Sequence, residues 1–375
     1  MKSSPPEKGP ALDAVVAGHL CLDIIPAFGE EAGAEAAAVF RPGSLHEVGP
    51  AAFSTGGAVS NTGLSLHKLG AAVRLIGKVG DDDFGGIVRR IIAGHGPRLG
   101  DGIITDAGSG TSYSIVISRP GTDRLFLHYP GANDAFRASD IPDGPLSCAR
   151  LFHFGYPPVM KSMYLQDGRE LAAAFRRAKK AGATTSLDMS LPDPASEAGR
   201  ADWPAILRSV LPWVDVFLPS FEEILFMLRR ETFERMRGEA AGTELIAGLG
   251  REILDMGAKI AVLKLGERGL YTRTADLSAI NDMGRARPAD PGNWADREMW
   301  APCFQVRVAG TTGSGDAAIA GFLMGLLRGF SPAMTLTVAC AVGACCVEAA
   351  DALSGIRPWQ ETLDRIAGGW PRVSL

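Results

Sequence analysis

The sequence lacks several features that would assign it to a common class of protein. Its first residues carry no apolar signal segment, and its most apolar stretch, Leu336–Val347, is too short to span a bilayer. None of its six cysteines forms a CxxC pair, and most have apolar sequence neighbours, which suits reduced, buried thiols. We therefore expect a soluble cytoplasmic protein with no membrane partner.

An excess of positive charge is also missing. The formal net charge is -4 and the sequence pI is about 5.9, so no general basic surface is available to neutralise a phosphate backbone. We expect no nucleic-acid partner, although a small anionic ligand could still be bound locally. With 46% apolar and 21% charged residues, the 375-residue chain has the composition of a globular protein, and it shows no internal repeat.

Strand and helix patterns alternate along most of the chain. A helix is predicted at Asn61–Gly70, and strands are predicted at Ala14–Ile25, Val73–Gly77, Thr111–Ser118, Arg124–Tyr129, Leu151–Phe154, Ala183–Asp188, Val214–Leu218 and Ile260–Leu265. This rhythm is typical of an α/β fold with an open, mostly parallel sheet covered by helices on both faces. The functional site should then lie at the carboxyl ends of the strands.

Four segments depart from this rhythm. Residues 1–10 are predicted to be a disordered leader. Residues 27–55 and 109–131 could pair as a small antiparallel lid beside the main sheet. Residues 275–302, rich in Asp, Arg, Pro, Gly and Trp, interrupt what should be a strand hairpin and are predicted to be a surface insertion.

The most specific motif is AGTTGSGDAAIAGF, at residues 309–322. Its glycine-rich turn leads into a helix, so Gly313, Ser314 and Gly315 would leave backbone N–H groups uncovered at a helix N-terminus, where phosphate oxygens bind. Asp316 in the first turn would be ionised and could accept a proton at neutral pH. The alternative is a helix-start aspartate with no catalytic role.

Two other nucleotide-binding motifs do not fit. The chain has no GxxxxGK[ST] sequence, and its glycine-rich turn is late in the chain and spaced GxxGxG instead of GxGxxG. Neither a P-loop nor a dinucleotide fold is therefore favoured.

The glycine-rich motif resembles the C-terminal signature of the PfkB family of carbohydrate kinases. The run GGAVSN at residues 56–61, with GLSLHKLG and GKVGDDDFG after it, is similar to the N-terminal signature of that family. The resemblance implies a ribokinase-like three-layer αβα fold, with a mostly parallel central sheet and a small antiparallel β lid, over residues 11–375. It also implies that Asp316 is the catalytic base and that Gly313, Ser314 and Gly315 hold the transferring phosphoryl group.

The resemblance assigns the acceptor site to residues near the N-terminus. Asp23, Gly57 and Asn61 match the positions that meet substrate hydroxyls, since a carboxylate accepts two hydrogen bonds and an amide both donates and accepts. Taken alone, Asp23 would be a turn residue and Asn61 a helix cap. The GGAVSN run lacks the lysine of the common GGKGxN form, which favours an unphosphorylated acceptor.

The resemblance also implies cofactors, ATP and Mg²⁺. Glu223 matches the metal-organising glutamate of the family's NxxE motif, with Ser220 in place of the asparagine; the alternative is a helix-start glutamate with no metal role. The nucleotide would be bordered by four further residues, namely Lys264, Gly266, Gly269 and Thr312. Gly310 replaces an aspartate that helps hold a monovalent cation, so dependence on such a cation is doubtful.

We therefore expect an ATP-dependent kinase acting on a hydroxyl of a small sugar-like substrate. A nucleoside kinase of the same fold is an alternative, favoured if aromatic lid residues such as Phe53, Tyr113 or Phe126 reach the acceptor. A regulatory homologue that binds sugar or nucleotide without turnover is another. A lid with one apolar face should pair with its twin, so we expect a homodimer.

Overall fold

A computed structural model describes residues 12–28, 42–43, 45–118, 125–236 and 241–374. The predicted leader lies outside the described residues, as do 29–41 and 119–124, which belong to the two predicted lid segments.

The described strands form two sheets. The larger has nine strands in the order β13-β12-β11-β10-β9-β8-β1-β4-β5, and the smaller has four in the order β3-β2-β6-β7. The strands are β1 Leu12–Gly18, β2 Cys21–Pro26, β3 Ala51–Gly56, β4 Val73–Gly80, β5 Ile103–Asp106, β6 Tyr113–Ile117, β7 Leu125–Tyr129, β8 Ala149–Gly155, β9 Thr184–Asp188, β10 Val216–Phe217, β11 Ile260–Lys264, β12 Leu270–Thr274 and β13 Glu298–Ala301. All pairings from β5 to β11 in the larger sheet are parallel, and β12 and β13 extend it as an antiparallel edge.

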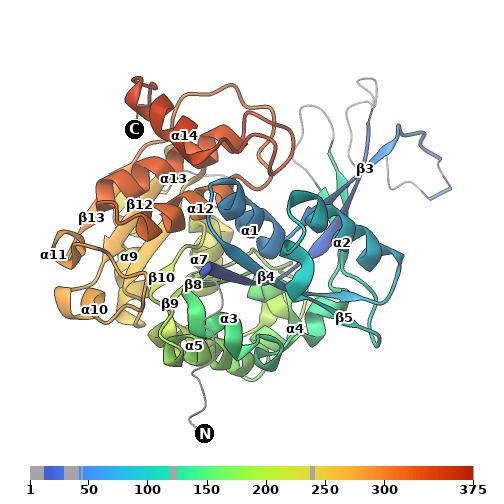
Figure 1. Cartoon of the computed structure of the whole chain (residues 1–375), viewed down its shortest axis with the longest axis horizontal. Helices are drawn as coiled ribbons and strands as arrows, with labels where there is room; N and C mark the ends of the chain where they lie inside the picture. The colour runs from blue at the N-terminus through green and yellow to red at the C-terminus, as the bar shows by residue number, and fades with distance from the viewer. Residues whose placement is uncertain (1–11, 29–41, 44, 119–124, 237–240, 375) are drawn as a thin grey trace, which may run out of the picture.

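Helices cover both faces of the larger sheet (Figure 1). They are α1 Ala58–Lys68, α2 Asp83–His95, α3 Asp143–Cys148, α4 Lys161–Tyr164, α5 Arg169–Lys180, α6 Trp203–Val210, α7 Phe221–Leu228, α8 Arg230–Arg235, α9 Thr243–Asp255, α10 Leu277–Asn281, α11 Pro291–Trp294, α12 Ser314–Leu327, α13 Pro332–Cys346 and α14 Trp359–Ala367. One apolar core joins the sheet to α1, α2, α12 and α13, and a second joins its other face to α3, α5, α6, α7 and α9. The predicted three-layer α/β architecture is confirmed.

The single strand predicted at Ala14–Ile25 is wrong, because the chain changes sheets within it. Strand β1 ends at Gly18, which has φ of 128°, and a Cβ there would lie 2.3 Å from the carbonyl oxygen of Gly155. The chain then turns through His19 and Leu20 and enters β2 of the smaller sheet. Asn133 fixes the turn by bonding both the N–H and the carbonyl of Leu20. A continuous apolar run could not reveal this break.

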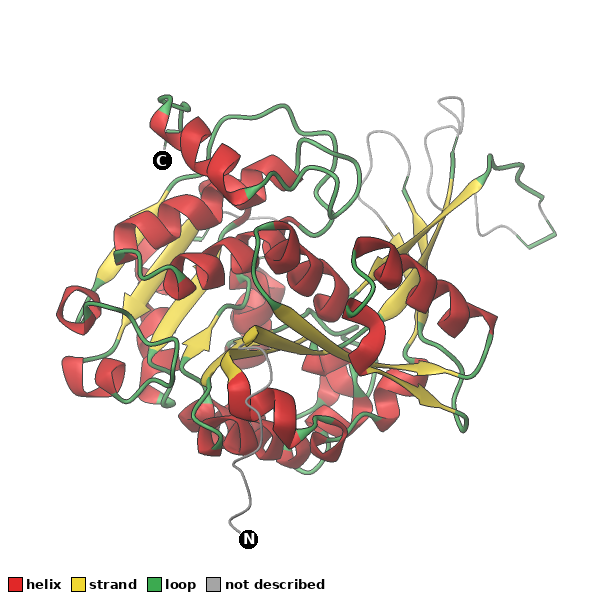
Figure 2. Cartoon of the chain, viewed as in Figure 1, coloured by secondary structure: helices red, strands yellow, loops and turns green. Residues whose placement is uncertain are grey.

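The smaller sheet forms the lid and projects from the side of the main body (Figure 2). Its outer pairings, β2 with β3 and β6 with β7, are antiparallel, whereas the central pairing of β2 with β6 is parallel. Strand β2 lies between the described strands of the two predicted lid segments, which therefore do not pair directly. Strand β2, which the sequence pattern placed in the main sheet, is therefore a lid strand. Asp23 therefore belongs to the smaller sheet and not to the main one.

The segment predicted as a surface insertion contributes to the core. It begins after β12 and contains α10, α11 and the whole of β13, so its two helices interrupt the β12–β13 hairpin. Its Trp294 is only 1% exposed and packs edge-on against Phe322 of α12. Arg285 donates hydrogen bonds to the carbonyl oxygens of Leu146 and Ala149. The segment thus ties the antiparallel edge to both helical layers.

Candidate active site

The carboxyl ends of neighbouring parallel strands bring the site together. His19 follows β1, Tyr156 follows β8, Asp188 ends β9 and Lys264 ends β11. Backbone hydrogen bonds join these ends: the His19 N–H donates to Gly155, and the Tyr156 N–H donates to Asp188. Side chains from distant parts of the sequence therefore converge at this edge, as expected for an open parallel sheet.

The N-terminus of α12 faces the same edge and offers backbone donors. Gly313 precedes the helix with φ of 70°, and a Cβ there would lie 2.5 Å from Cβ of Ala352, so glycine is required for both backbone conformation and space. The Ser314 N–H already donates to Thr311, whereas the amides of Gly315 and Asp316 have no acceptor among the described residues. Helix N-terminal amides of this kind bind anions.

Asp316 is buried and accepts three hydrogen bonds from side chains. Its Oδ2 accepts from Asn61 Nδ2 at 3.1 Å and from the Tyr156 hydroxyl at 2.7 Å, and its Oδ1 accepts from Thr62 Oγ1 at 2.9 Å. Two of these donors lie on α1, which packs beside α12. Such a set of donors fixes the orientation of the carboxylate.

A buried ion pair lies beside the helix N-terminus. Lys264 Nζ lies 2.5 Å from Asp188 Oδ1, and the two side chains are 13% and 1% exposed. Burial lowers the pKa of Lys264, but the carboxylates of Asp188 and Glu223 outweigh burial and raise the pKa above its ordinary value. A Cβ built on Gly315 would lie 3.8 Å from Lys264 Nζ. The ammonium therefore adds a fixed positive charge next to the free amides of α12.

Glu223 forms a capping box at the start of α7. The Ser220 N–H donates to Glu223 Oε2 at 2.6 Å, and the Glu223 N–H donates to Ser220 Oγ at 3.2 Å. This satisfies the helix start by itself, as the alternative interpretation expects. Burial also raises the pKa of the Glu223 carboxyl, so a cation nearby would favour the ionised form.

A cavity of about 900 Å³ lies between the lid and the α12 N-terminus. Its lining includes residues that the sequence assigned to different roles, namely Asp23, Gly57, Asn61, Thr312, Gly313 and Asp316. The structure thus places the predicted acceptor residues, the predicted base and part of the glycine-rich turn around one cavity. The described lining contains four aspartates and neither lysine nor arginine.

Close packing shapes the acceptor end of this cavity. A Cβ on Gly56 would lie 2.4 Å from Asp23 Oδ2, and a Cβ on Gly57, which has φ of 87°, would lie 2.4 Å from the His19 carbonyl oxygen. The two glycines therefore make room for Asp23 and His19. Asn61 Oδ1 is buried with no partner among the described residues, which leaves an acceptor for a substrate hydroxyl.

The aromatic lid residues separate into two groups. Phe126 lines the cavity, whereas Tyr113 packs against Phe84 and Tyr129, and Phe53 is half exposed outside the lining. Among these three residues, only Phe126 is placed to contact an acceptor.

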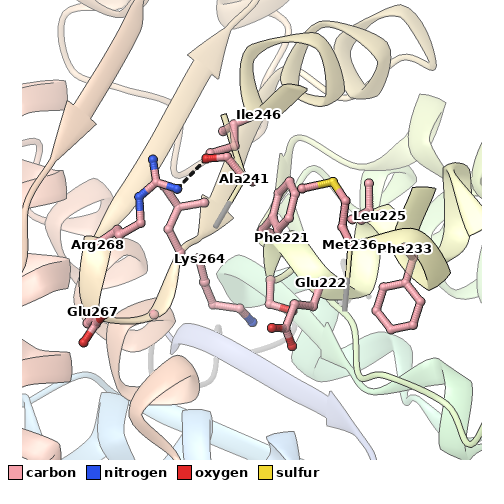
Figure 3. A pocket seen from close by; sticks show the side chains of 13 residues that line it. Phe221, Glu222, Leu225, Phe233, Met236, Ala241, Ile246, Lys264, Glu267 and Arg268 are labelled. Carbon is pink, nitrogen blue, oxygen red and sulfur yellow. Dashed lines mark hydrogen bonds between the residues drawn. The ribbon is translucent and has the colours of Figure 1, made fainter. Parts of the chain in front are cut away.

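The predicted nucleotide residues are not all in one place. Lys264 and Gly266 border a second cavity of about 640 Å³, which Figure 3 shows between the β11 end and the apolar side chains of Phe221, Leu225, Phe233 and Met236. Thr312 lines the larger cavity. Gly269 borders neither; a Cβ there would lie 2.0 Å from the Ala301 carbonyl oxygen, so its glycine is explained by the close approach of β13.

Three residues that touch or flank Asp316 were not predicted from the sequence. Thr62 and Tyr156 donate to Asp316, and Asp188 pairs with Lys264. Asp188 and Tyr156 had a usable signal, because each polar side chain comes at or just after the end of a buried strand. Thr62 had none, since it reads as an ordinary helix residue.

Metal-binding side chains are sparse. No group of three or more His, Cys, Asp or Glu residues with the geometry to hold a metal ion occurs in the described part of the chain. Nor does any helix there combine the length and apolar character needed to cross a membrane.

The fold and site together define an α/β protein with free amides at a helix N-terminus, a buried carboxylate and a polar cavity beside them. The family model for "pfkB family carbohydrate kinase" matches residues 14–359, and the chain belongs to this family. It is similar to fructokinase-1 of Zea mays, with 23% identity over 320 residues that cover 83% of this chain and 82% of the relative. It is 26% identical to a probable fructokinase-5 of Arabidopsis thaliana over 274 residues, 72% and 73% of the two chains.

Solved structures confirm the fold. The crystal structure of a fructokinase with bound ATP from Xylella fastidiosa superposes with a TM-score of 0.71 at 21% identity, covering 95% of this chain and 98% of the other. A nucleoside kinase from Methanocaldococcus jannaschii gives a TM-score of 0.65 at 18% identity, covering 96% and 100%. The predicted family, the ribokinase-like fold and the carbohydrate kinase activity are therefore confirmed.

Proposed function

We propose that this kinase transfers the γ-phosphoryl group of ATP to a hydroxyl of a small, uncharged sugar, with Asp316 as the general base. One observation carries the proposal: Asp316 lies at the wall of a 900 Å³ cavity, in the helical turn whose free amides adjoin Lys264. A proton acceptor and a cationic phosphate site are thus adjacent. Phosphoryl transfer requires such positioning and charge stabilisation more than covalent chemistry.

In the proposed reaction, Asp316 removes the proton of the acceptor hydroxyl as its oxygen attacks the γ-phosphorus. The new O–P bond forms while the bond to the β–γ bridging oxygen breaks, and ADP leaves with that electron pair. The amides of Gly315 and Asp316, with the Lys264 ammonium, stabilise charge on the transferring group. Asn61 Oδ1 and Asp23 accept hydrogen bonds from acceptor hydroxyls, and the lid keeps water from the base.

The charge of the cavity supports an unphosphorylated acceptor. Its described lining holds Asp23, Asp134, Asp193 and Asp316 without a lysine or arginine, so a sugar phosphate or sugar acid would meet repulsion and no partner. The fructokinase relatives favour a free ketose of hexose size. Fructose is therefore the first acceptor to test.

A nucleoside acceptor is the second candidate, because Phe126 lines the cavity and its ring could stack on a base. ADP release with ATP and magnesium should be measured for fructose, ribose, a 2-keto-3-deoxy sugar acid, fructose 6-phosphate and adenosine. We expect turnover with a free sugar. Preference for adenosine would transfer the proposal to a nucleoside kinase, and no ADP release with any compound would favour a non-catalytic binding protein.

Magnesium fits the residues present. Mg²⁺ is usually held by one or two carboxylates together with substrate phosphates and water, so the lack of a three-residue cluster does not conflict with it. Glu223, whose carboxylate oxygen Oε1 is not used by the capping box, would hold the ion through water. The ion would neutralise charge on the ATP phosphates.

A monovalent cation held by an aspartate at position 310 does not fit. A Cβ on Gly310 would lie 2.8 Å from the carbonyl oxygen of Ala350 and 3.0 Å from that of Ala349. An aspartate would therefore have to displace this backbone. We infer that activity does not depend on potassium bound by this route.

We also infer a homodimer formed through the lid. Leu125 and Leu127 alternate along β7 with the cavity-lining Phe126 and His128, so they face outward, where they are 37% and 43% exposed. Leu127→Lys should convert a dimer into a monomer in sedimentation experiments at micromolar concentration. Finding only a 39.5 kDa species for the unmodified chain would overturn this inference. We also propose a cytoplasmic location, because six free cysteines suit a reducing compartment.

A further inference from the structure

Tyr156 holds an unusual backbone conformation next to the base. Its φ of 65° and ψ of 43° lie in the left-handed region, which a bulky residue rarely adopts, and Pro157 follows it. A residue before proline is ordinarily extended. Strain of this kind persists where the surrounding structure fixes it, commonly at functional sites.

The strained turn delivers the Tyr156 hydroxyl to Asp316. The hydroxyl donates to Asp316 Oδ2 at 2.7 Å, the shortest of the three bonds that reach this carboxylate. Since Asn61 donates to the same oxygen, Oδ2 has both its lone pairs used. Oδ1 accepts only from Thr62 and keeps one lone pair for an incoming hydroxyl.

The ring of Tyr156 is held by aromatic neighbours that reach to the lid. His19 stacks on it with ring centroids 6.2 Å apart and an interplanar angle of 28°. His128 of lid strand β7 contacts His19 in turn, with centroids 5.1 Å apart. Burial lowers the pKa of both histidines, so the row stays uncharged at neutral pH.

The charges around the hydroxyl keep it a donor. Burial, followed by the nearby carboxylates of Asp316 and Asp188, raises the pKa of Tyr156 well above its ordinary value, and Glu223 acts in the same direction. The other titratable groups facing Asp316 are Lys264 from β11 and Cys346 from α13. Tyr156 therefore remains protonated throughout the range in which a kinase operates.

We propose that Tyr156 is a positioning residue for Asp316: it occupies Oδ2, so that Oδ1 is the oxygen that takes the proton of the acceptor. This inference rests on the proposed role of Asp316 as the base. It explains why a strained tyrosine stands at the end of β8. The proposal also gives a function to the row of rings formed by Tyr156, His19 and His128: the two histidines fix the tyrosine ring, and its hydroxyl fixes the Asp316 carboxylate.

The test is Tyr156→Phe, which keeps the ring and its stacking on His19. We expect the rate at neutral pH to fall roughly 10-fold, because a hydrogen bond to a charged group is lost. The loss should appear in kcat, with KM for the acceptor little changed, because the ring keeps its place and only the orientation of the carboxylate is affected. ATP affinity should not change.

Tyr271→Phe is the matched control. Tyr271 is also buried and donates to a carboxylate, Glu298 at 3.2 Å, but it lies in the β12–β13 hairpin. This variant should lose some thermal stability and keep kcat. If Tyr156→Phe behaves in the same way, the inference is overturned.

Different results would overturn the proposed function and the positioning role of Tyr156. Retained activity in Asp316→Asn would overturn the proposed function itself. Loss of activity in Asp316→Asn, together with an unchanged kcat in Tyr156→Phe, would overturn only the positioning role of Tyr156.

Discussion

Replacing Lys264 should destabilise the protein and weaken ATP binding in one step. Its ammonium lies 2.5 Å from Asp188, which is 1% exposed, and the carboxylates of Glu223 and Asp316 lie close enough to influence it. Lys264→Met removes the cation while keeping an unbranched side chain of similar length. Asp188 would then be buried without a counter-charge, close to two other carboxylates, those of Glu223 and Asp316.

The expected size of the effect follows from this burial. Removing one partner of a buried ion pair costs about 3–5 kcal/mol, because the other charge is left uncompensated. Asp188→Leu should cost a similar amount by leaving Lys264 unpaired. The double variant should cost less than the sum of the two, since it leaves neither charge alone, and the coupling free energy should exceed about 1 kcal/mol.

Urea unfolding at pH 7 of the unmodified protein, the two single variants and the double variant measures this coupling. ATP binding by the folded variants tests the role of Lys264 in holding phosphate. The surface pair Arg230–Glu234, with side chains 36% and 58% exposed, is the matched control. Its cycle should give only about 0.3–0.5 kcal/mol. Additive losses at positions 188 and 264, or single losses below about 1 kcal/mol, would refute the reasoning.

Two further substitutions test the phosphate and metal sites. Gly313→Ala should destabilise the protein by about 1–3 kcal/mol and lower the rate, because the new Cβ meets both a positive φ and Ala352; Gly70→Ala, with φ of 93° and open space, is the control and should leave the rate unchanged. Glu223→Gln should keep the bond from the Ser220 N–H but raise the magnesium concentration needed for half-maximal rate. An unchanged magnesium titration would remove Glu223 from the metal site.

The fold was predictable because its signals are local. Alternating apolar strands and amphipathic helices indicated the parallel sheet, and the SxxE pattern at Ser220 and Glu223 forms the capping box that such spacing predicts. The break between β1 and β2 was not predictable, because Gly18 turns the chain by meeting Gly155, which is 137 positions away in the sequence. The same limit explains why Trp294 looked like a surface residue.

The site was predictable only in part. The glycine-rich turn and Asp316 are contiguous, so one motif revealed them. The partners of Asp316 come from α1 and the end of β8, with Asn61 separated from it by 255 residues and Tyr156 by 160. Such contacts depend on tertiary packing, and a single sequence gives no sign of which distant hydroxyl reaches a given carboxylate.

The most direct test of the account is the rate of Asp316→Asn. Asparagine is nearly isosteric: its carbonyl oxygen can take the place of Oδ2 and keep the bonds from Asn61 and Tyr156, and its NH2 group can donate to the Thr62 hydroxyl. Melting temperature and ATP affinity should therefore change little. Without a base, kcat should fall roughly 10²–10⁴-fold. A slightly destabilised variant that retains the original kcat would contradict the assignment of Asp316 as the base.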